Sequence, residues 1–228
     1  GKARGGRCDA REGRSVTLQT DRGTWIRERI GLLTASRMAD AMSFLKPKKG
    51  ETELRESADR RNYKIELVVC RVEDRAADHY VSKDMEKGLE FEPVARRAYI
   101  VKTGELVEPA SLVHHPRIEF FAGTPDGFVG TDGLVEFKVP RSSTFTKWVL
   151  ADEPPPEHLP QMTAQIAVTG RKWVDFCAYN PDNPAHQRLF IRRFTPSKEQ
   201  IKEVEDAATA FLKEVDAMFD AYVARLAA

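Results

Sequence analysis

The chain has 228 residues, of which 31% are charged and 41% hydrophobic, and its formal net charge is +1. This composition is ordinary for a globular protein, and no apolar run approaches the length needed to cross a bilayer. The sequence shows no signal-peptide pattern, and its three cysteines are too few and too far apart to indicate a disulfide framework or a zinc site. We therefore expect a protein of the reducing cytoplasm.

Charge is distributed unevenly along the chain. Residues 1–61 carry 15 Lys and Arg against 9 Asp and Glu, a local charge of +6 that leaves −5 for the remainder. This basic third could face a polyanion, although ordinary solvation explains it as well. Residues 1–23 are rich in Gly and Arg without helical periodicity, so we expect a flexible arm or an expression-derived segment there. Residues 24–228 are expected to form one domain.

Two short helices are predicted first, over residues 24–29 and 34–42. The second places Ser36 in a first helical turn, where free backbone N–H groups favour a phosphate, and Arg29 could supply positive charge. The basic loop 45–50 makes Lys48 a candidate nucleic-acid contact, with solvated charge as the alternative.

Two longer helices are predicted next. Residues 62–75 carry a broad apolar face. Residues 85–99 follow and place Glu92 close to the core, although a glutamate on a helix is solvent-exposed by default.

The central stretch begins with β-branched and aromatic residues at 117–122, which predict a strand, and continues into a Thr124–Gly127 turn that puts Asp126 at the strand end. A second turn at 131–133 returns the chain into a strand at 134–139. Because side chains alternate along a strand, Glu136 and Lys138 share one face and the apolar residues take the other.

Asp126 and Glu136 should therefore meet across a hairpin, and two converging carboxylates require a cation. Mg²⁺ is the natural partner, because it accepts one or two carboxylates and keeps waters for a phosphate substrate. Lys138 could orient or deprotonate a water, or stabilise charge on the phosphate. Each motif alone is usually a turn or a surface ion pair, but their combination in one hairpin is much more specific.

The remaining chain is predicted as a helix at 157–168, two strands at 172–179 and 187–194, and a last helix that begins at Thr195–Pro196. Gln161 and Gln165 stand four apart on one face of the first of these helices. The apolar stripe of the last helix indicates core packing, with self-association a lesser alternative. His114 and His115 are interpreted as strand residues that face opposite ways.

Residues 25–181 resemble the family of lambda exonuclease and the YqaJ-type phage recombinases, within the PD-(D/E)xK nuclease superfamily. The shared signals, in the family's order, are W-x3-R-x-G-x2-TAS from Trp25, G-x2-[FY]-E from Gly88, PDG from Pro125, ExK from Glu136 and Q-x3-Q from Gln161. The resemblance implies an α/β fold with a restriction-endonuclease-like core, in which a central mixed β-sheet is flanked by helices.

The resemblance also implies a role for each matching residue. Asp126 and Glu136 would bind Mg²⁺, for which Mn²⁺ would substitute, with the main-chain carbonyl of Phe137 as a further ligand and Glu92 at a second ion or its waters. Lys138 would position and activate the attacking water, and Gln161 would orient that lysine or the water, with hydrogen bonding in the core as its alternative role. The other implied positions concern the DNA: Arg29, Ser36 and Thr124 for the terminal 5′-phosphate, and Met85 as a wedge between strands.

One departure concerns a further phosphate-binding arginine of the family. Thr144 aligns with it, and Arg141 stands three residues earlier as a substitute. The implied activity is Mg²⁺-dependent 5′-to-3′ digestion of one strand of linear duplex DNA, in bacterial or phage-infected cytoplasm. The implied partners are a single-strand annealing recombinase and two further copies in a homotrimeric ring. A DNA endonuclease and a non-catalytic DNA-end binding module are the alternatives.

Overall fold

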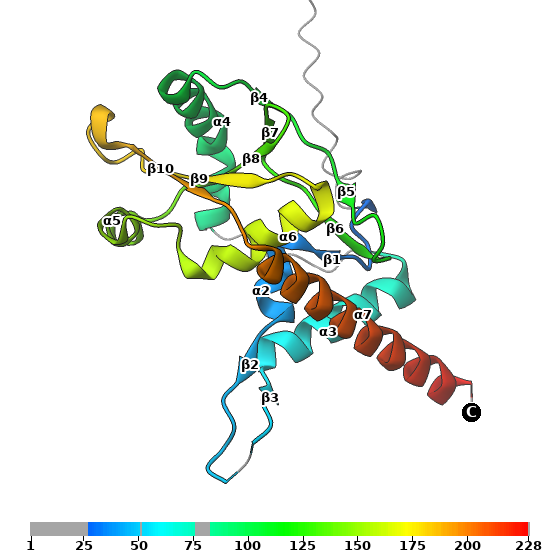
Figure 1. Cartoon of the computed structure of the whole chain (residues 1–228). Helices are drawn as coiled ribbons and strands as arrows, with labels where there is room; N and C mark the ends of the chain where they lie inside the picture. Colours follow the sequence, from blue (N-terminus) through cyan, green and yellow to red (C-terminus); the bar gives the residue numbers. More distant parts are fainter. Residues whose placement is uncertain (1–26, 51, 76–82, 228) are drawn as a thin grey trace, which may run out of the picture.

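The computed structural model describes residues 27–50, 52–75 and 83–227, and a five-stranded mixed sheet lies at its centre (Figure 1). The strand order is β10–β9–β8–β7–β4; β8 and β9 are parallel, and the other neighbouring pairs are antiparallel. The strands are β4 (Val107–Glu108), β7 (Gly127–Val129), β8 (Gly133–Lys138), β9 (Trp173–Tyr179) and β10 (Leu189–Phe194). The predicted fold class, a central mixed sheet flanked by helices, is confirmed.

A second, smaller sheet lies beside the first and has the order β1–β6–β5. Its strands are β1 (Leu33–Thr34), β5 (Val113–His114) and β6 (Phe121–Gly123). β1 runs parallel to β6, so the chain leaves both strands at the same edge. A hairpin formed by β2 (Phe44–Leu45) and β3 (Arg55–Glu56) projects away from the two sheets (Figure 1).

Helices cover both faces of the central sheet (Figure 1). They are α2 (Met38–Ala41), α3 (Ala58–Glu73), α4 (Lys83–Thr103), α5 (Ser142–Ala151), α6 (Leu159–Thr169) and α7 (Lys198–Leu226), with one-turn 3₁₀ helices η1 (Ala35–Arg37), η2 (Pro156–His158) and η3 (Ala185–Gln187). Helix α4 packs on one face, while α5 and α6 pack on the other. Helices α3 and α7 pack together below the small sheet.

The alternation predicted for β8 decides which core each side chain joins. Val135 and Phe137 pack in the cluster beneath α4, together with the buried Tyr99. Leu134 points the other way, into the cluster that holds Trp148 of α5 and residues of α6. Glu136 and Lys138, in phase with Leu134, must therefore face α6.

Three element boundaries differ from expectation. The last helix begins after Ser197 rather than at Thr195–Pro196, because the Ser197 hydroxyl accepts from the Gln200 N–H and Gln200 caps it in return. The strand expected at 117–122 begins only at Phe121, because Phe120 has a φ of +60°, which breaks the extended backbone. The helix expected at 34–42 is divided into η1 and α2.

The broad apolar face expected on the first long helix is only partly buried. Leu67 and Val68 of α3 enter the core, whereas Ile65, Val69 and Val72 are between 39% and 47% exposed. Most of the helix expected at 24–29 and the arm expected at 1–23 lie outside the described residues.

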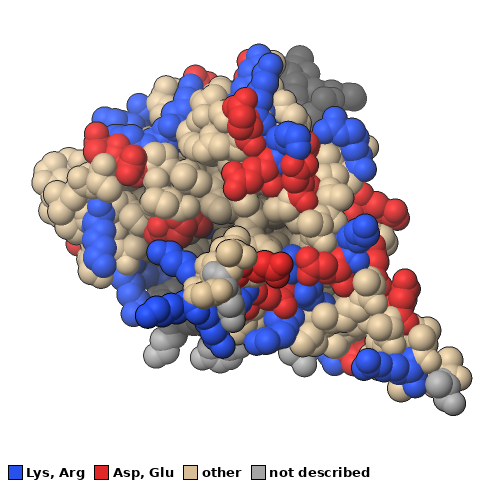
Figure 2. All heavy atoms as spheres, turned by 60° about the horizontal axis from the view of Figure 1, so that its bottom comes forward, with Lys and Arg blue, Asp and Glu red and all other residues tan. Residues whose placement is uncertain are grey.

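The surface mixes both signs of charge. On the face that Figure 2 turns forward, Lys and Arg are interspersed with Asp and Glu, as expected from a net charge of +1. Within the part of the chain that the structure describes, no helix is long and apolar enough to span a bilayer.

A network of charged side chains joins α3 to α7. Arg60, only 3% exposed, donates to both carboxylate oxygens of Glu214 at 2.7 Å, and Lys64 donates to the same carboxylate at 2.8 Å. Glu56 completes the cluster with a 2.7 Å bond from Arg60. The guanidinium is thus paired on two sides, as burial of a charge requires.

Replacing Glu214 by Gln should destabilise the protein and reduce its sensitivity to acid. The hydrogen bond from Arg60, against partial burial and aided by Lys64, lowers the pKa of Glu214 to about 2. A carboxylate whose pKa is lowered by folding stabilises the folded protein at pH values above its unfolded-state pKa, about 4.3. This stabilisation is lost as the pH falls towards about 2. Because Glu214 is partly exposed, we expect the substitution to lower the free energy of unfolding at pH 7 by about 1 kcal/mol. Urea unfolding at pH 7 and pH 2.5 measures the difference.

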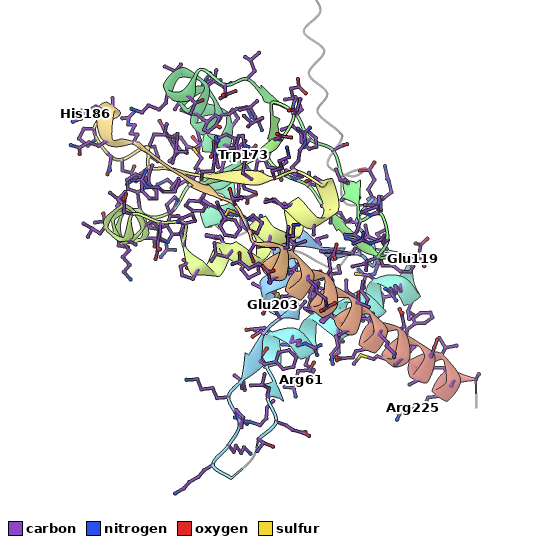
Figure 3. All side chains as sticks on the ribbon, viewed as in Figure 1. Arg61, Glu119, Trp173, His186, Glu203 and Arg225 are labelled. Carbon is purple, nitrogen blue, oxygen red and sulfur yellow. The ribbon has the colours of Figure 1, made fainter. Side chains whose placement is uncertain are left out.

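The matched control is Glu203→Gln on the same helix, where the side chain is exposed (Figure 3). Equal pH dependence of stability in the two variants would contradict a specific role for Glu214.

Candidate active site

The turn before β7 and the end of β8 meet through one hydrogen bond. The main-chain N–H of Phe137 donates to Asp126 Oδ2 at 2.6 Å. The antiparallel register of β7 and β8, with Gly127 opposite Val135, brings the turn to this position. The hairpin that the sequence predicted therefore exists, and it fixes the Asp126 carboxylate beside Glu136 and Lys138.

Glu136 is a buried carboxylate with a complete set of donors. It is 2% exposed, and its two oxygens accept from Gln161 Nε2 and Gln165 Nε2 at 2.6 Å each. Lys138 Nζ lies 2.6 Å from the first of these oxygens. Both glutamines come from consecutive turns of α6, so the four-residue spacing seen in the sequence lets one helix grip both oxygens.

Lys138 is held between Glu136 and Gln161. Its ammonium group donates to Gln161 Oε1 at 3.2 Å while it pairs with Glu136. Burial opposes charge on this lysine, but Glu136, Asp126 and Glu92 outweigh it and raise the pKa of Lys138. The side chain is therefore protonated in this arrangement, and 27% of it is exposed. It can donate to an approaching phosphate or water.

The surroundings of Asp126 disfavour its charged form. Burial raises the pKa of Asp126 well above its usual range, and the carboxylates of Glu136 and Glu92 add to the effect. Lys138 opposes the rise but does not cancel it. A cation beside these groups would favour the charged carboxylates.

The oxygen donors fit a hard divalent cation. Across residues 27–50, 52–75 and 83–227, no three His, Cys, Asp or Glu side chains are arranged to hold a metal ion. Asp126 and Glu136, however, offer two carboxylates, and Mg²⁺ needs only one or two because it retains several waters. Glu92, from α4, interacts electrostatically with Asp126, but the three carboxylates are not arranged to hold an ion together.

A second group of predicted residues meets at the edge of the small sheet. Arg29 Nη2 donates to the Thr124 hydroxyl, although the two residues are 95 positions apart. Burial, opposed by the charge of Glu28, lowers the pKa of Arg29 to about 10, which leaves it charged at neutral pH. The parallel β1–β6 register places Ser36, just after β1, at the same edge as Thr124, just after β6. Thr34 Oγ1 lies 3.2 Å from Ser36 Oγ.

The other predicted DNA contacts lie further out. Lys48 is exposed in the loop of the β2–β3 hairpin, and Met85 is 53% exposed on the first turns of α4. Arg141 is exposed immediately before α5, while Thr144 is half-buried within that helix. The roles of these residues in DNA binding stay predictions.

Two side chains at the site were not assigned a role from the sequence. Gln165 was noticed only for its spacing from Gln161, a spacing that could have indicated its contact with Glu136. The sequence places Arg96 on the same helical face as Leu89 and Glu92 without indicating a role for it, yet its Nη2 donates to the main-chain oxygen of Asp126 at 2.5 Å. The only signal for it was its position four residues after Glu92, which is common on helices.

Comparisons with known proteins agree with this geometry. Residues 24–172 match the YqaJ-like viral recombinase domain. The chain is also similar to an alkaline exonuclease from Laribacter hongkongensis, with 36% identity over 89% of this chain and 96% of that chain and a TM-score of 0.79; that protein has also been solved in complex with dAMP. A phage-related exonuclease from Haemophilus somnus 129PT shares the fold at 14% identity, with a TM-score of 0.64 over 84% and 96% of the two chains. No curated protein matches the sequence.

Gly127 is required by close packing around the turn, so Gly127→Ala should destabilise the fold. A Cβ there would lie 2.3 Å from Val107 Cγ1 and 3.1 Å from the Glu108 main-chain oxygen. Overpacking of this kind costs about 1–3 kcal/mol. Thermal unfolding followed by circular dichroism measures the loss.

Gly88→Ala is the control, because a Cβ at this helical position would meet nothing within 4 Å. Its free energy of unfolding should rise by roughly 0.5–1 kcal/mol, because alanine makes the unfolded chain less flexible than glycine does. If Gly127→Ala were as stable as Gly88→Ala, the packing argument would be wrong.

Proposed function

Because this chain belongs to the YqaJ-like viral recombinase family and is a nuclease, we propose that it digests one strand of linear double-stranded DNA from the 5′ end. The products would be 5′-mononucleotides and a 3′ single-stranded tail. The observation that carries the proposal is the convergence of Asp126, Glu136 and Lys138 on one hairpin, gripped by Gln161 from α6.

The reaction would be in-line hydrolysis at phosphorus. Asp126 and Glu136, with the main-chain oxygen of Phe137 and with Glu92 nearby, would hold Mg²⁺ or Mn²⁺. When bound, such an ion supplies charge stabilisation at the attacking and leaving oxygens and lowers the pKa of a water. The burial of Asp126 beside Glu136 supports this role, because a bound cation would stabilise the charged carboxylate that burial disfavours.

Lys138 would orient the attacking water and stabilise charge on the phosphate. Its raised pKa makes it a donor rather than a base while the carboxylates beside it are unneutralised. Gln161 bridges Lys138 and Glu136, so it would keep the ammonium group in line with the carboxylate. This favours the orienting role over the deprotonating role among those that the sequence allowed.

A terminal phosphate would be held by Arg29, Thr124 and Ser36. The charged guanidinium of Arg29 already lies against the Thr124 hydroxyl, and Ser36 lies at the same sheet edge. Charge-assisted hydrogen bonds of this kind are about twice as strong as neutral ones and suit a phosphate. Arg141 would add charge from the start of α5.

The duplex would extend outwards from this pocket. Met85, exposed on α4, would act as a wedge between the strands, and Lys48 would contact the backbone from the β2–β3 hairpin. We also propose one nuclease domain over residues 24–228, a homotrimeric ring around the DNA, and a single-strand annealing recombinase that receives the tail in the cytoplasm. These parts rest on the resemblance to the family.

Lys138→Ala should lower mononucleotide release from a linear, 5′-phosphorylated duplex about 100- to 1,000-fold, because loss of one positioned donor to the charge that develops in the transition state costs about that much. Release should require Mg²⁺ and stop in chelator. Lys172→Ala is the control, since that lysine forms a surface pair with Asp132 and is 70% exposed. Nucleotide release is measured by chromatography.

The same assay separates the alternatives. Cleavage of closed circular DNA would indicate an endonuclease. Binding to duplex ends in Mg²⁺ without any product, in the wild-type protein, would indicate a binding module, and the proposed reaction would be abandoned.

Arg29→Gln should reduce the preference for a 5′-phosphate over a 5′-hydroxyl end by roughly 10- to 100-fold, the value of a hydrogen bond to a charged group. Arg27→Gln, two residues away and exposed, should keep the preference. Initial rates on the two kinds of end give the ratio directly. An unchanged ratio in Arg29→Gln would remove Arg29 from the phosphate pocket.

A further inference from the structure

Arg96 projects from α4 to the turn that carries Asp126. Its Nη2 donates to the main-chain oxygen of Asp126 at 2.5 Å, across 30 positions of sequence. The side chain is 25% exposed, so much of its length is packed against protein. This bond fixes the backbone of Asp126 from one side, while the Phe137 N–H fixes its carboxylate from the other.

The same guanidinium contacts two further residues of the site. Arg96 Nη2 also lies 3.3 Å from Glu92 Oε1, one helical turn earlier on α4. Its central carbon lies 5.4 Å from the centroid of the Phe137 ring, within the range of a cation–π contact. One side chain therefore contacts three of the four residues that we propose to surround the metal ion: Glu92, Asp126 and Phe137.

The turn itself is shaped to admit this side chain. A Cβ on Gly127 would lie 3.1 Å from Arg96 Nη1, tighter than an ordinary contact. The glycine of the PDG motif thus leaves room for the guanidinium as well as for Val107. Arg97, the next residue on α4, is exposed instead.

We propose that Arg96 is a positioning residue of the metal centre: it ties α4, the Asp126 turn and β8 together so that their oxygen ligands face one point. The inference rests on the proposed function, since it concerns the same ion. A simple ion pair between Glu92 and Arg96 would not explain the arrangement, because the shortest contact is the one to the Asp126 carbonyl. Partners of metal ligands typically change metal affinity when they are removed.

The direction in which metal affinity changes when Arg96 is replaced distinguishes a positioning role from a purely electrostatic one. Arg96 is a cation beside a cation site, so its charge alone opposes metal binding, and losing that charge would tighten it. Loss of positioning acts in the opposite direction, because the ligands must then be ordered at the moment of binding. A weaker site after removal of a positive charge can therefore be attributed to geometry.

The test is a titration of Mn²⁺ into Arg96→Met, Arg96→Lys and the control Arg97→Met, with free Mn²⁺ measured by electron paramagnetic resonance. Circular dichroism at the same temperature confirms that each variant is folded. We expect Arg96→Met to raise the Mn²⁺ dissociation constant roughly 10- to 100-fold, the usual range for such partners. Arg96→Lys should weaken binding less, because it keeps a donor but loses the planar contact with Phe137. Arg97→Met should match the wild type.

Dissociation constants in both Arg96 variants equal to or below that of Arg97→Met would overturn the proposal. If Arg96→Met fails to fold, Arg96→Lys decides, since it retains the charge. A wild-type protein that binds no Mn²⁺ and releases no nucleotide would instead overturn the proposed function, so the two failures are distinguishable.

Discussion

The charge of Glu136 is the constraint on which the rest of the structure depends. A carboxylate that is 2% exposed on the central sheet is costly unless donors surround it. β8 supplies Lys138 on the same face, and α6 supplies Gln161 and Gln165 from consecutive turns. Helix α6 must therefore pack against the sheet at one rotation and one height. The helical core on that face, which includes Trp148, is built around this requirement.

The carboxylates next to Glu136 are less completely paired with cations than Glu136 itself. Asp126 and Glu92 add two carboxylates, while Lys138 and Arg96 are the cations with contacts to this group in the described residues. Burial first, and then the charges of Glu136 and Glu92, raise the pKa of Asp126. Local conflicts of this kind concentrate at functional sites, where a ligand resolves them. Stability and ion binding are thereby coupled, because a cation held by the folded chain would also stabilise it.

Much of this site followed from local chemistry. Turn residues around Pro125 and the two-residue alternation along β8 were enough to place Asp126, Glu136 and Lys138 together, since both signals act over a few residues. The parallel pairing of β1 with β6 was not predictable, because strands of two or three residues carry no periodicity. The positive φ of Phe120 had no signal either, since an aromatic residue rarely adopts it. Arg96 was missed because its contact with Asp126 is tertiary.

Under the proposed function, the length of chain between the two parts of the site would relate recognition of the DNA end to the size of the product. Thr124 ends the segment that reaches Arg29, and Asp126 begins the carboxylate cluster, so the two residues are two positions apart with Pro125 between them. Two residues span at most roughly 7 Å, a distance on the order of one nucleotide along a strand. If Arg29 and Thr124 hold a terminal phosphate, the bond nearest the carboxylates is the next phosphodiester. Release of single nucleotides then follows from the length of the backbone between the two residues, and a longer connection would be expected to release longer fragments.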